Sequence, residues 1–414
     1  MEKFLYNLAI LSYLTLIRTS SVFNTKAKLW IKGRKKIFKR LSQAIPQDVK
    51  KLAWFHCASV GEFEQGRPLI ERFRHDFPDY KILLTFFSPS GYELRKNYPH
   101  ADYIFYLPID NKWNARKFLA IVKPTVIFFI KYEFWYNYIR EIKRNEIPLI
   151  SVSAIFRESQ LFFKPYGKFY ASLLKNFNHI FVQDEQSKKL LESINYKEIT
   201  VAGDTRFDRV KQISTSAAEI PLMEKFRDHQ PLIVAGSTWS EDMDLLIPFI
   251  NSFSQPLKLI IAPHEIDENQ IEGFIKRINK KSIRFSQVNF DNVKDFQILF
   301  IDNIGMLSSL YRYGNYAFIG GGFGKGIHNI LEAVVQGIPV FFGPNYQRFK
   351  EARDMIKLEA AFSVKSNQEF AKWFSELYHS PEKRIQIKEK ASDYIEQNTG
   401  ATSKIIDYCK LIIR

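Results

Sequence analysis

Short apolar runs that alternate with stretches of helical periodicity are the feature that most constrains the fold of this sequence. In the first half, these runs predict strands at Leu52–Ala58, Lys81–Phe86, Thr125–Ile130, Pro148–Val152 and His179–Val182. Helical patterns lie between them, for example at Phe63–Phe77, Asn111–Val122 and Glu133–Arg144. Short apolar strands separated by helices are typical of a parallel sheet that is covered on both faces. The chain is therefore predicted to be an α/β protein.

A second series of strands after a polar interruption predicts two domains. The pattern pauses over Gly203–Ala218 and then resumes with strands at Pro231–Ala235, Leu257–Ala262, Gln297–Ile301, Tyr316–Ile319 and Pro339–Phe342. A chain of 414 residues is also long for a single core. We expect Rossmann-like domains at residues 41–210 and 211–414, with the last helix a candidate to pack back on the first. Ligands of such sheets bind beyond the carboxyl ends of the strands, so a central cleft between the two domains is expected.

The N-terminal 40 residues combine an apolar stretch with a basic run. As a helix, Phe4–Ile17 would span about 21 Å, whereas a bilayer core needs about 30 Å. Nine lysines and arginines and no acids lie between Arg18 and Arg40, and each cation near an anionic leaflet contributes roughly 1 kcal/mol. We expect residues 1–40 to form a membrane-associated helix, spanning or surface-lying, at the cytoplasmic face of a membrane. A signal peptide and an ordinary core helix are the alternatives.

The net charge and the cysteine content limit which binding partners and which cellular compartment are expected. The formal net charge of +16 attracts anionic lipid, nucleic acid and phosphorylated substrates alike. No recognised nucleic-acid motif interleaves basic and aromatic residues, so a nucleic-acid partner is not expected. Cys57 and Cys409 are far apart, offer no zinc spacing and fit a reducing compartment.

Three charged residues lie where predicted strands end. Glu62 follows the first strand in the turn Ala58-Ser59-Val60-Gly61, and Glu133 follows the strand that ends at Ile130. Both carboxylates would project into the expected cleft, although an acid at a helix start also favours the helix dipole. Arg206, at the domain boundary, is able to bind a phosphate or carboxylate, or to pair with Asp204 or Asp208.

A glycine-rich stretch gives the strongest local signal. Five glycines lie between Gly320 and Gly326, directly after a predicted strand and before a predicted helix at Ile330–Gln336. Bare amides followed by a helix N-terminus favour an anion, so we expect a phosphate cradle; a loop without ligand is the alternative. The spacing matches neither a dinucleotide fingerprint nor a P-loop. Glu332 is placed to accept hydrogen bonds from ribose hydroxyl groups.

Other strand ends in the second half offer further contacts to a nucleotide. Pro263 and His264 follow one strand, and the turn Ile304-Gly305-Met306 follows the next. Asp242 and Asp244 have the D-x-D spacing of metal-dependent sugar transferases, but they lie at a predicted helix start, where acids serve as caps. No metal site is expected.

Taken together and in this order, these segments resemble the Kdo (3-deoxy-D-manno-octulosonic acid) transferases of lipid A assembly. The resemblance rests on A-S-V-G-E at 58–62, E-x-W at 133–135, G-x-x-R-F-D at 203–208, A-G-S-T at 235–238, H-N-x-L-E at 328–332 and G-x-P-V-x-x-G-P at 337–344. It departs from the family pattern at Arg206, where lysine is usual, and at Pro263-His264-Glu265, where Pro-Arg-His is common.

The resemblance implies a GT-B fold, a CMP-Kdo donor, a lipid A precursor as acceptor and attachment to the inner membrane. By position, Glu62 resembles the catalytic base, and Glu133 and Arg206 resemble groups that stabilise the transition state. The CMP site would comprise Pro263, His264, Ile304, Gly305, Met306, Asn329, Ile330, Leu331 and Glu332. Inverting transfer without metal or other cofactor is expected. The rivals are another GT-B enzyme, such as a sugar-nucleotide epimerase, and a basic membrane-binding protein without activity.

Overall fold

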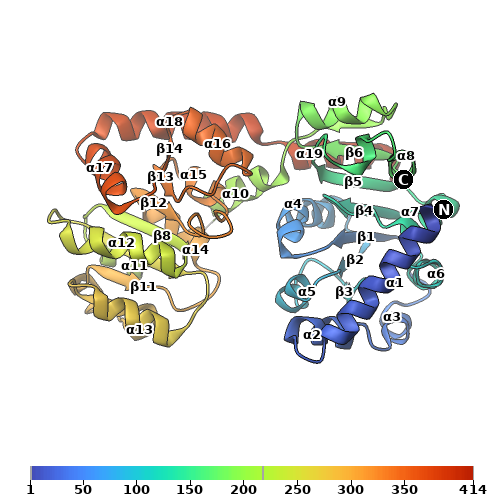
Figure 1. The fold of residues 1–414 in the computed structure, drawn as a ribbon, viewed down its shortest axis with the longest axis horizontal. Coiled ribbons are helices and arrows are strands. Elements are labelled where there is room, and N and C mark those ends of the chain that lie inside the picture. The colour runs from blue at the N-terminus through green and yellow to red at the C-terminus, as the bar shows by residue number, and fades with distance from the viewer. Residues whose placement is uncertain (1, 217–218, 414) are drawn as a thin grey trace. The chain divides into compact units, whose positions relative to one another are not determined.

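The computed structural model describes residues 2–216 and 219–413, which form two compact units. The first unit runs to Arg209 and also includes the segment from Thr399 onward, and the second runs from Val210 to Asn398. The chain therefore passes from one unit to the other twice (Figure 1). Each unit is described by itself below.

The first unit is built on a parallel seven-stranded sheet of order β3-β2-β1-β4-β5-β6-β7. Its strands are β1 Leu52–Cys57, β2 Lys81–Phe86, β3 Tyr103–Tyr106, β4 Val126–Ile130, β5 Leu149–Ala154, β6 His179–Val182 and β7 Ile199–Val201. The central strand β1 pairs with both β2 and β4, so Trp54 lies between Leu83 and Ile127. The strand order reverses between β1 and β4, which is where open α/β sheets bind ligands.

Helices cover both faces of this sheet, because alternate strand residues point to opposite sides. Trp54 belongs to the core on one face, whereas Phe55 belongs to the core on the other. The helices of this unit are α1 Glu2–Ser20, α2 Thr25–Arg34, α3 Ile37–Ala44, α4 Val60–Asp76, α5 Pro89–Arg95, α6 Lys112–Val122, α7 Tyr136–Arg144, α8 Lys168–Leu174, α9 Glu185–Ser193 and α19 Ala401–Ile412.

The C-terminal helix α19 packs against α4 in the first unit. Ile405, Ile406 and Cys409 of α19 are buried in the same core cluster as Phe63 of α4. Asp208 fixes the start of α19, since its carboxylate accepts hydrogen bonds from the backbone N–H groups of Gly400 (2.6 Å) and Thr402 (2.7 Å).

The second unit contains another parallel seven-stranded sheet, of order β10-β11-β9-β8-β12-β13-β14. Its strands are β8 Leu232–Thr238, β9 Lys258–Pro263, β10 Ser282–Arg284, β11 Ile298–Phe300, β12 Tyr316–Ile319, β13 Val340–Phe342 and β14 Ala361–Ser363. Here the order reverses between β8 and β12. Its helices are α11 Pro221–Arg227, α12 Ser240–Ser252, α13 Glu268–Arg277, α14 Leu307–Leu310, α15 Leu331–Val334, α16 Lys350–Lys357, α17 Asn367–Tyr378 and α18 Pro381–Asn398.

Several predicted element boundaries are wrong; for example, α4 starts at Val60 rather than Phe63, and β8 ends at Thr238 rather than Ala235. The polar stretch from Gly203, expected to be an interruption, forms helix α10 (Thr205–Ser216), because Phe207 and Val210 on one face are buried; residues 217–218 of that stretch lie outside the described residues. Helix α7 starts at Tyr136 rather than Glu133, since Asp110 caps it by accepting hydrogen bonds from the N–H groups of residues 137 and 138. Helix α15 spans only four residues and ends before a turn at Gly337 with φ of 69°.

Helix α1 packs against the rest of the first unit, and many of its apolar side chains are exposed. Tyr6 holds it in place by donating a hydrogen bond of 2.6 Å to the buried carboxylate of Asp110. Phe4, Leu8 and Leu11 are exposed. In the described part of the chain, no helix has both the length and the apolar character needed to cross a bilayer.

Candidate active site

Glu62 lies in the first turn of α4, at the carboxyl edge of the first sheet beside the point where the strand order reverses. Its Oε2 accepts hydrogen bonds from the backbone N–H (3.0 Å) and the hydroxyl of Ser59, which closes a capping box. The predicted helix-start role is therefore present. The side chain is half-buried, and Oε1 has no hydrogen bond to any described residue. The capping contacts orient the carboxylate and leave one oxygen for chemistry.

Glu133 follows β4 and is almost completely buried, with 5% of its surface exposed. Its Oε2 accepts a hydrogen bond of 2.5 Å from Trp135 Nε1 and lies 3.1 Å from Nε2 of the buried His56. The His56 contact has the distance of an ion pair but is poorly aligned for a hydrogen bond. On its other side, His56 Nδ1 lies 2.9 Å from the hydroxyl of Thr85. The buried Glu133 carboxylate thus connects Trp135 and His56 at the carboxyl edge of the sheet.

Arg206 at the start of α10 pairs with Asp204. Its Nε donates to Asp204 Oδ2 at 2.9 Å, and its Nη2 lies 2.8 Å from the same oxygen. Burial raises the pKa of Asp204, but the charge and hydrogen bonds of Arg206 outweigh this and hold that pKa below its usual value. The predicted boundary salt bridge is therefore formed with Asp204, whereas Asp208 caps α19.

The strand-edge groups of the first unit converge on Tyr132. Burial raises the pKa of the Tyr132 hydroxyl; Arg157 acts against this, and the charges of Glu62, Asp184 and Asp204 raise the pKa further. These acids follow β1, β6 and β7, so groups from several strand ends lie near Tyr132 together with Arg157. Sequence reasoning missed His56, because a histidine inside an apolar strand carries no signal of the partner that it will meet.

In the second unit, three aromatic side chains stack at the carboxyl edge of the sheet. His264, after β9, stacks on both Trp239, at a centroid distance of 4.5 Å, and His328, at 4.3 Å. Trp239 Nε1 donates a hydrogen bond of 3.1 Å to His328 Nε2. Burial, followed by the charge of His264, lowers the pKa of His328 to about 4, so His328 is neutral at pH 7 with Nε2 as an acceptor. Of these three, only His264 was assigned to the nucleotide site from the sequence.

The glycine-rich stretch folds into a tight turn between strand ends. A side chain at Gly320 would meet the backbone of Ser237 at 2.2 Å, and one at Gly322 would meet that of Gly343 at 2.5 Å. Glycine is therefore required here for close backbone approach. The predicted helix N-terminus behind this turn is wrong in extent, because α15 has only four residues. Any anion site here therefore depends on the loop amides rather than on a helix dipole.

The remaining predicted contact residues surround this edge of the second unit. Asn329 Nδ2 donates a hydrogen bond of 3.2 Å to Glu332 Oε1, whereas the side chains of Ile330 and Leu331 are buried. Their contribution to a ligand would come from the backbone. Ile304 is 87% exposed, and Gly305 next to it has a φ of 99°. Pro263 ends β9, and Met306 precedes the short helix α14.

Asp242 behaves as the predicted helix cap. It is fully buried, and its Oδ2 accepts hydrogen bonds of 2.8 Å from the N–H groups of Trp239 and Gly321. Its Oδ1 has no hydrogen-bond partner among the described residues. Burial raises the pKa of Asp242 to about 6, although the two N–H groups act in the opposite direction. Asp244 instead pairs with Arg277 at the surface, and no cluster of three or more metal-binding side chains occurs within residues 2–216 and 219–413.

Replacing Asp242 by asparagine tests this buried carboxylate. Between about pH 4 and pH 6, the folded chain retains a proton that the unfolded chain has lost, so stability falls as the pH rises through this window. Asp242→Asn keeps an acceptor for both N–H groups and does not ionise. The free energy of unfolding of the parent chain should fall by about 3 kcal/mol across this window, and that of the variant should not. The free energies are measured by urea unfolding of both chains at each pH. Asp244→Asn is the matched control, and equal pH profiles for Asp242→Asn and the parent would contradict the assignment.

Comparisons with known proteins agree with this architecture. Residues 33–209 match the model of the 3-deoxy-D-manno-octulosonic acid transferase (Kdotransferase) family. The transferase of that name from Aquifex aeolicus is 28% identical over 353 residues, which is 84% of this chain and 91% of the relative. The transferase of that name from Haemophilus influenzae is 25% identical over 370 residues, which is 86% of each chain.

Solved structures of low identity share the fold. The UDP-GlcNAc 2-epimerase of Neisseria meningitidis aligns over 86% of this chain and 98% of its own, with a TM-score of 0.59 and 15% identity. A putative UDP-N-acetylglucosamine 2-epimerase from Listeria monocytogenes aligns equally well, with a TM-score of 0.59. The predicted GT-B type fold with two doubly wound sheets is confirmed. The predicted resemblance to Kdo transferases, and with it the prediction of a glycosyltransferase, is also confirmed.

Proposed function

Because this chain carries the Kdo-transferase family domain and resembles Kdo transferases over most of its length, we propose that it transfers Kdo from CMP-Kdo to a lipid A precursor similar to lipid IVA, in lipopolysaccharide core biosynthesis. The observation that carries the proposal is Glu62: an oriented, half-buried carboxylate at the ligand-binding edge of the first sheet.

In the proposed mechanism, Glu62 acts as a general base in an inverting transfer that uses no metal. Glu62 Oε1 accepts the proton of the acceptor hydroxyl while that oxygen attacks the anomeric carbon of Kdo. The bond from this carbon to the CMP phosphate oxygen breaks, and CMP leaves with the bonding electrons. The capping contacts from Ser59 hold Oε2, so the carboxylate does not have to be oriented during each turnover.

Two further charged groups support this step in different ways. The Arg206 guanidinium stabilises the charge that gathers on the departing phosphate, and its ion pair with Asp204 orients the guanidinium. Glu133 is buried and acts indirectly, by positioning Trp135 and His56. Glu133 is therefore a positioning residue in this mechanism, although the family resemblance implies a role in stabilising the transition state.

The second unit is proposed to bind CMP at its carboxyl edge. Loop amides of the glycine-rich turn contact the phosphate, and the exposed turn at Ile304-Gly305-Met306 with Pro263 and His264 contacts the base. Glu332 accepts hydrogen bonds from the ribose, and Asn329 holds its carboxylate in place. The stack with Trp239 and His328 fixes the ring plane of His264. A site of this kind discriminates nucleobases by backbone and side-chain contacts at the turn.

Nucleotide protection tests the donor class. We expect CMP to raise the thermal unfolding midpoint of the chain at concentrations where UDP leaves it unchanged, because only a ligand that binds the folded state stabilises it. His264→Ala should reduce the CMP effect, whereas Glu265→Ala next to it serves as the matched control. Protection by UDP but not by CMP would favour a function closer to that of the UDP-sugar epimerases that share the fold.

We also propose that helix α1 attaches the chain to the cytoplasmic face of the inner membrane by lying on its surface. The Tyr6–Asp110 hydrogen bond holds α1 against the first unit while Phe4, Leu8 and Leu11 stay exposed. Deleting Met1 to Phe23 should weaken the sedimentation of the chain with membranes and spare its activity on detergent-dispersed acceptor. A truncated chain that sediments with membranes as strongly as the full chain would place the attachment elsewhere.

A further inference from the structure

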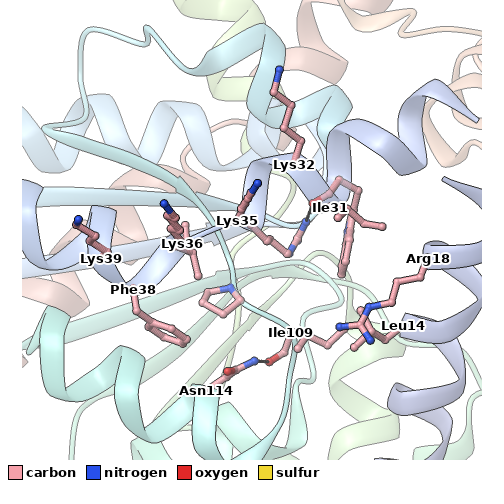
Figure 2. Close-up of a pocket in the computed structure, with 14 residues that line it drawn as sticks. Leu14, Arg18, Ile31, Lys32, Lys35, Lys36, Phe38, Lys39, Ile109 and Asn114 are labelled. Atoms are coloured by element: carbon pink, nitrogen blue, oxygen red, sulfur yellow. Dashed lines mark hydrogen bonds between the residues drawn. The ribbon is translucent and has the colours of Figure 1, made fainter. Parts of the chain in front are cut away.

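A pocket with a strongly basic lining opens in the first unit, beside α1, α2 and α3. Its volume is about 420 Å³, and its floor is apolar, with Leu14, Ile31 and Ile109 among the contributors. Six cationic residues line it, and none of its described lining residues is acidic: Arg18, Lys32, Arg34, Lys35, Lys36 and Lys39. Figure 2 labels five of them: Arg18, Lys32, Lys35, Lys36 and Lys39. An apolar floor below a cationic rim suits an anionic amphiphile.

The start of helix α3 adds backbone donors to the same pocket. Ile37 begins the helix, and Lys36 before it has a φ of 53° and makes no side-chain cap. The first turn of α3 contains no acidic residue. The N–H groups of this turn have no acceptor within the helix, and they favour a negatively charged group.

Arg34 in the pocket lining carries a charge that forms no ion pair with a carboxylate within residues 2–216 and 219–413. Its guanidinium donates to the backbone carbonyl groups of Phe87 (2.7 Å), Leu107 (2.8 Å) and Trp30 (3.2 Å), and it lies 3.7 Å from the centre of the Trp30 ring. Burial lowers the pKa of Arg34 to about 9. The indole N–H of Trp30, also in the lining, is buried without a hydrogen-bond partner among the described residues. The Trp30 N–H thus remains available to a hydrogen-bond acceptor, and the charge of Arg34 favours an anionic one.

We propose that this pocket binds the phosphate group of an anionic membrane phospholipid. The lysines of the rim and the N–H groups at the start of α3 hold the phosphate oxygens, while the apolar floor contacts the acyl chains of the lipid. Leu14 and Arg18 belong to α1, whose exposed apolar side chains include Leu8 and Leu11, so the pocket and the apolar surface share one helix. The pocket thus distinguishes a phosphate headgroup from other anionic groups, whereas a diffuse basic surface does not. Its role in membrane binding does not depend on the transfer reaction.

The test compares vesicles that carry the same negative surface charge from different groups. Phosphatidylcholine vesicles are doped either with phosphatidylglycerol or with oleate, adjusted to equal zeta potential, and binding is measured by co-sedimentation without donor or acceptor. We expect the full chain to bind the phosphatidylglycerol vesicles roughly tenfold more tightly, since charge-assisted hydrogen bonds to phosphate require a matching site.

Two double variants with equal loss of charge separate the pocket from the rest of the basic run. Lys35→Ala with Lys39→Ala removes two pocket cations, and Lys26→Ala with Lys28→Ala removes two exposed cations outside the lining. Both pairs should weaken binding to anionic vesicles, but only the first should abolish the preference for phosphatidylglycerol. Loss of the preference in both pairs or in neither would overturn the proposal. Suppression of the preference by inorganic phosphate at equal concentration would also overturn it, because the site would then be one for free phosphate.

Discussion

Glu62→Gln is expected to lower kcat by about 10²–10⁴-fold, the range that a general base contributes. The variant keeps the size of the side chain and an oxygen that can accept from Ser59, so the helix start and the fold are retained. What it loses is the ability to take a proton from the acceptor hydroxyl. The kcat is measured at saturating donor and acceptor, with protection by CMP as the check that donor binding is unchanged.

Glu64→Gln is the matched control for this experiment. Glu64 lies two residues along the same helix, is also half-buried, and pairs with Arg95 at 2.8 Å. A general loss of negative charge at the start of α4 would affect both variants alike. Near-normal turnover by Glu62→Gln, or an equal loss in Glu64→Gln, would remove Glu62 from the role of base.

Glu133→Ala is expected to destabilise the first unit by about 3 kcal/mol. The substitution leaves the partly buried Trp135 Nε1 without its acceptor, which costs about 1–3 kcal/mol, and removes the carboxylate that lies beside the buried His56. It also opens a cavity below the strand edge. The effect is measured as a shift in the urea unfolding midpoint of the chain.

Two further variants serve as comparisons for Glu133→Ala. Glu133→Gln keeps an acceptor for Trp135 and should lose less than half as much stability. Glu158→Ala, at an exposed position, should change stability by less than about 0.5 kcal/mol. If Glu133→Ala were no more destabilising than Glu158→Ala, the contacts of Glu133 with His56 and Trp135 would not hold the strand edge together.

The fold was largely predictable because its central strands are continuous apolar runs. The predictions near β1, β4 and β12 match the structure within one residue, because strands that are buried on both faces consist almost entirely of apolar residues. Short outer strands such as β10 and β14 were not predicted. Each has only three residues, so pairing with a neighbour rather than local pattern decides their conformation.

The local contacts of the candidate site residues were predictable where charge follows a strand, and not where contacts join distant segments. Glu62 and Asp242 act as helix caps, which their positions after strands indicated. The contact between Glu133 and His56 could not be predicted from the sequence, because His56 lies 77 residues earlier and is close to Glu133 only through the pairing of β1 with β4. The stack of Trp239, His264 and His328 likewise joins three strand ends that no spacing rule connects.

The most direct measurement of the central claim is mass spectrometry of the product formed from CMP-Kdo and a tetra-acylated lipid A precursor. With the full chain and without added divalent metal, we predict an acceptor whose mass has increased by one or more Kdo residues, together with an equivalent amount of CMP. The Glu62→Gln chain should produce almost none. Release of CMP without a heavier lipid, or transfer of a different sugar from a UDP donor, would contradict the account.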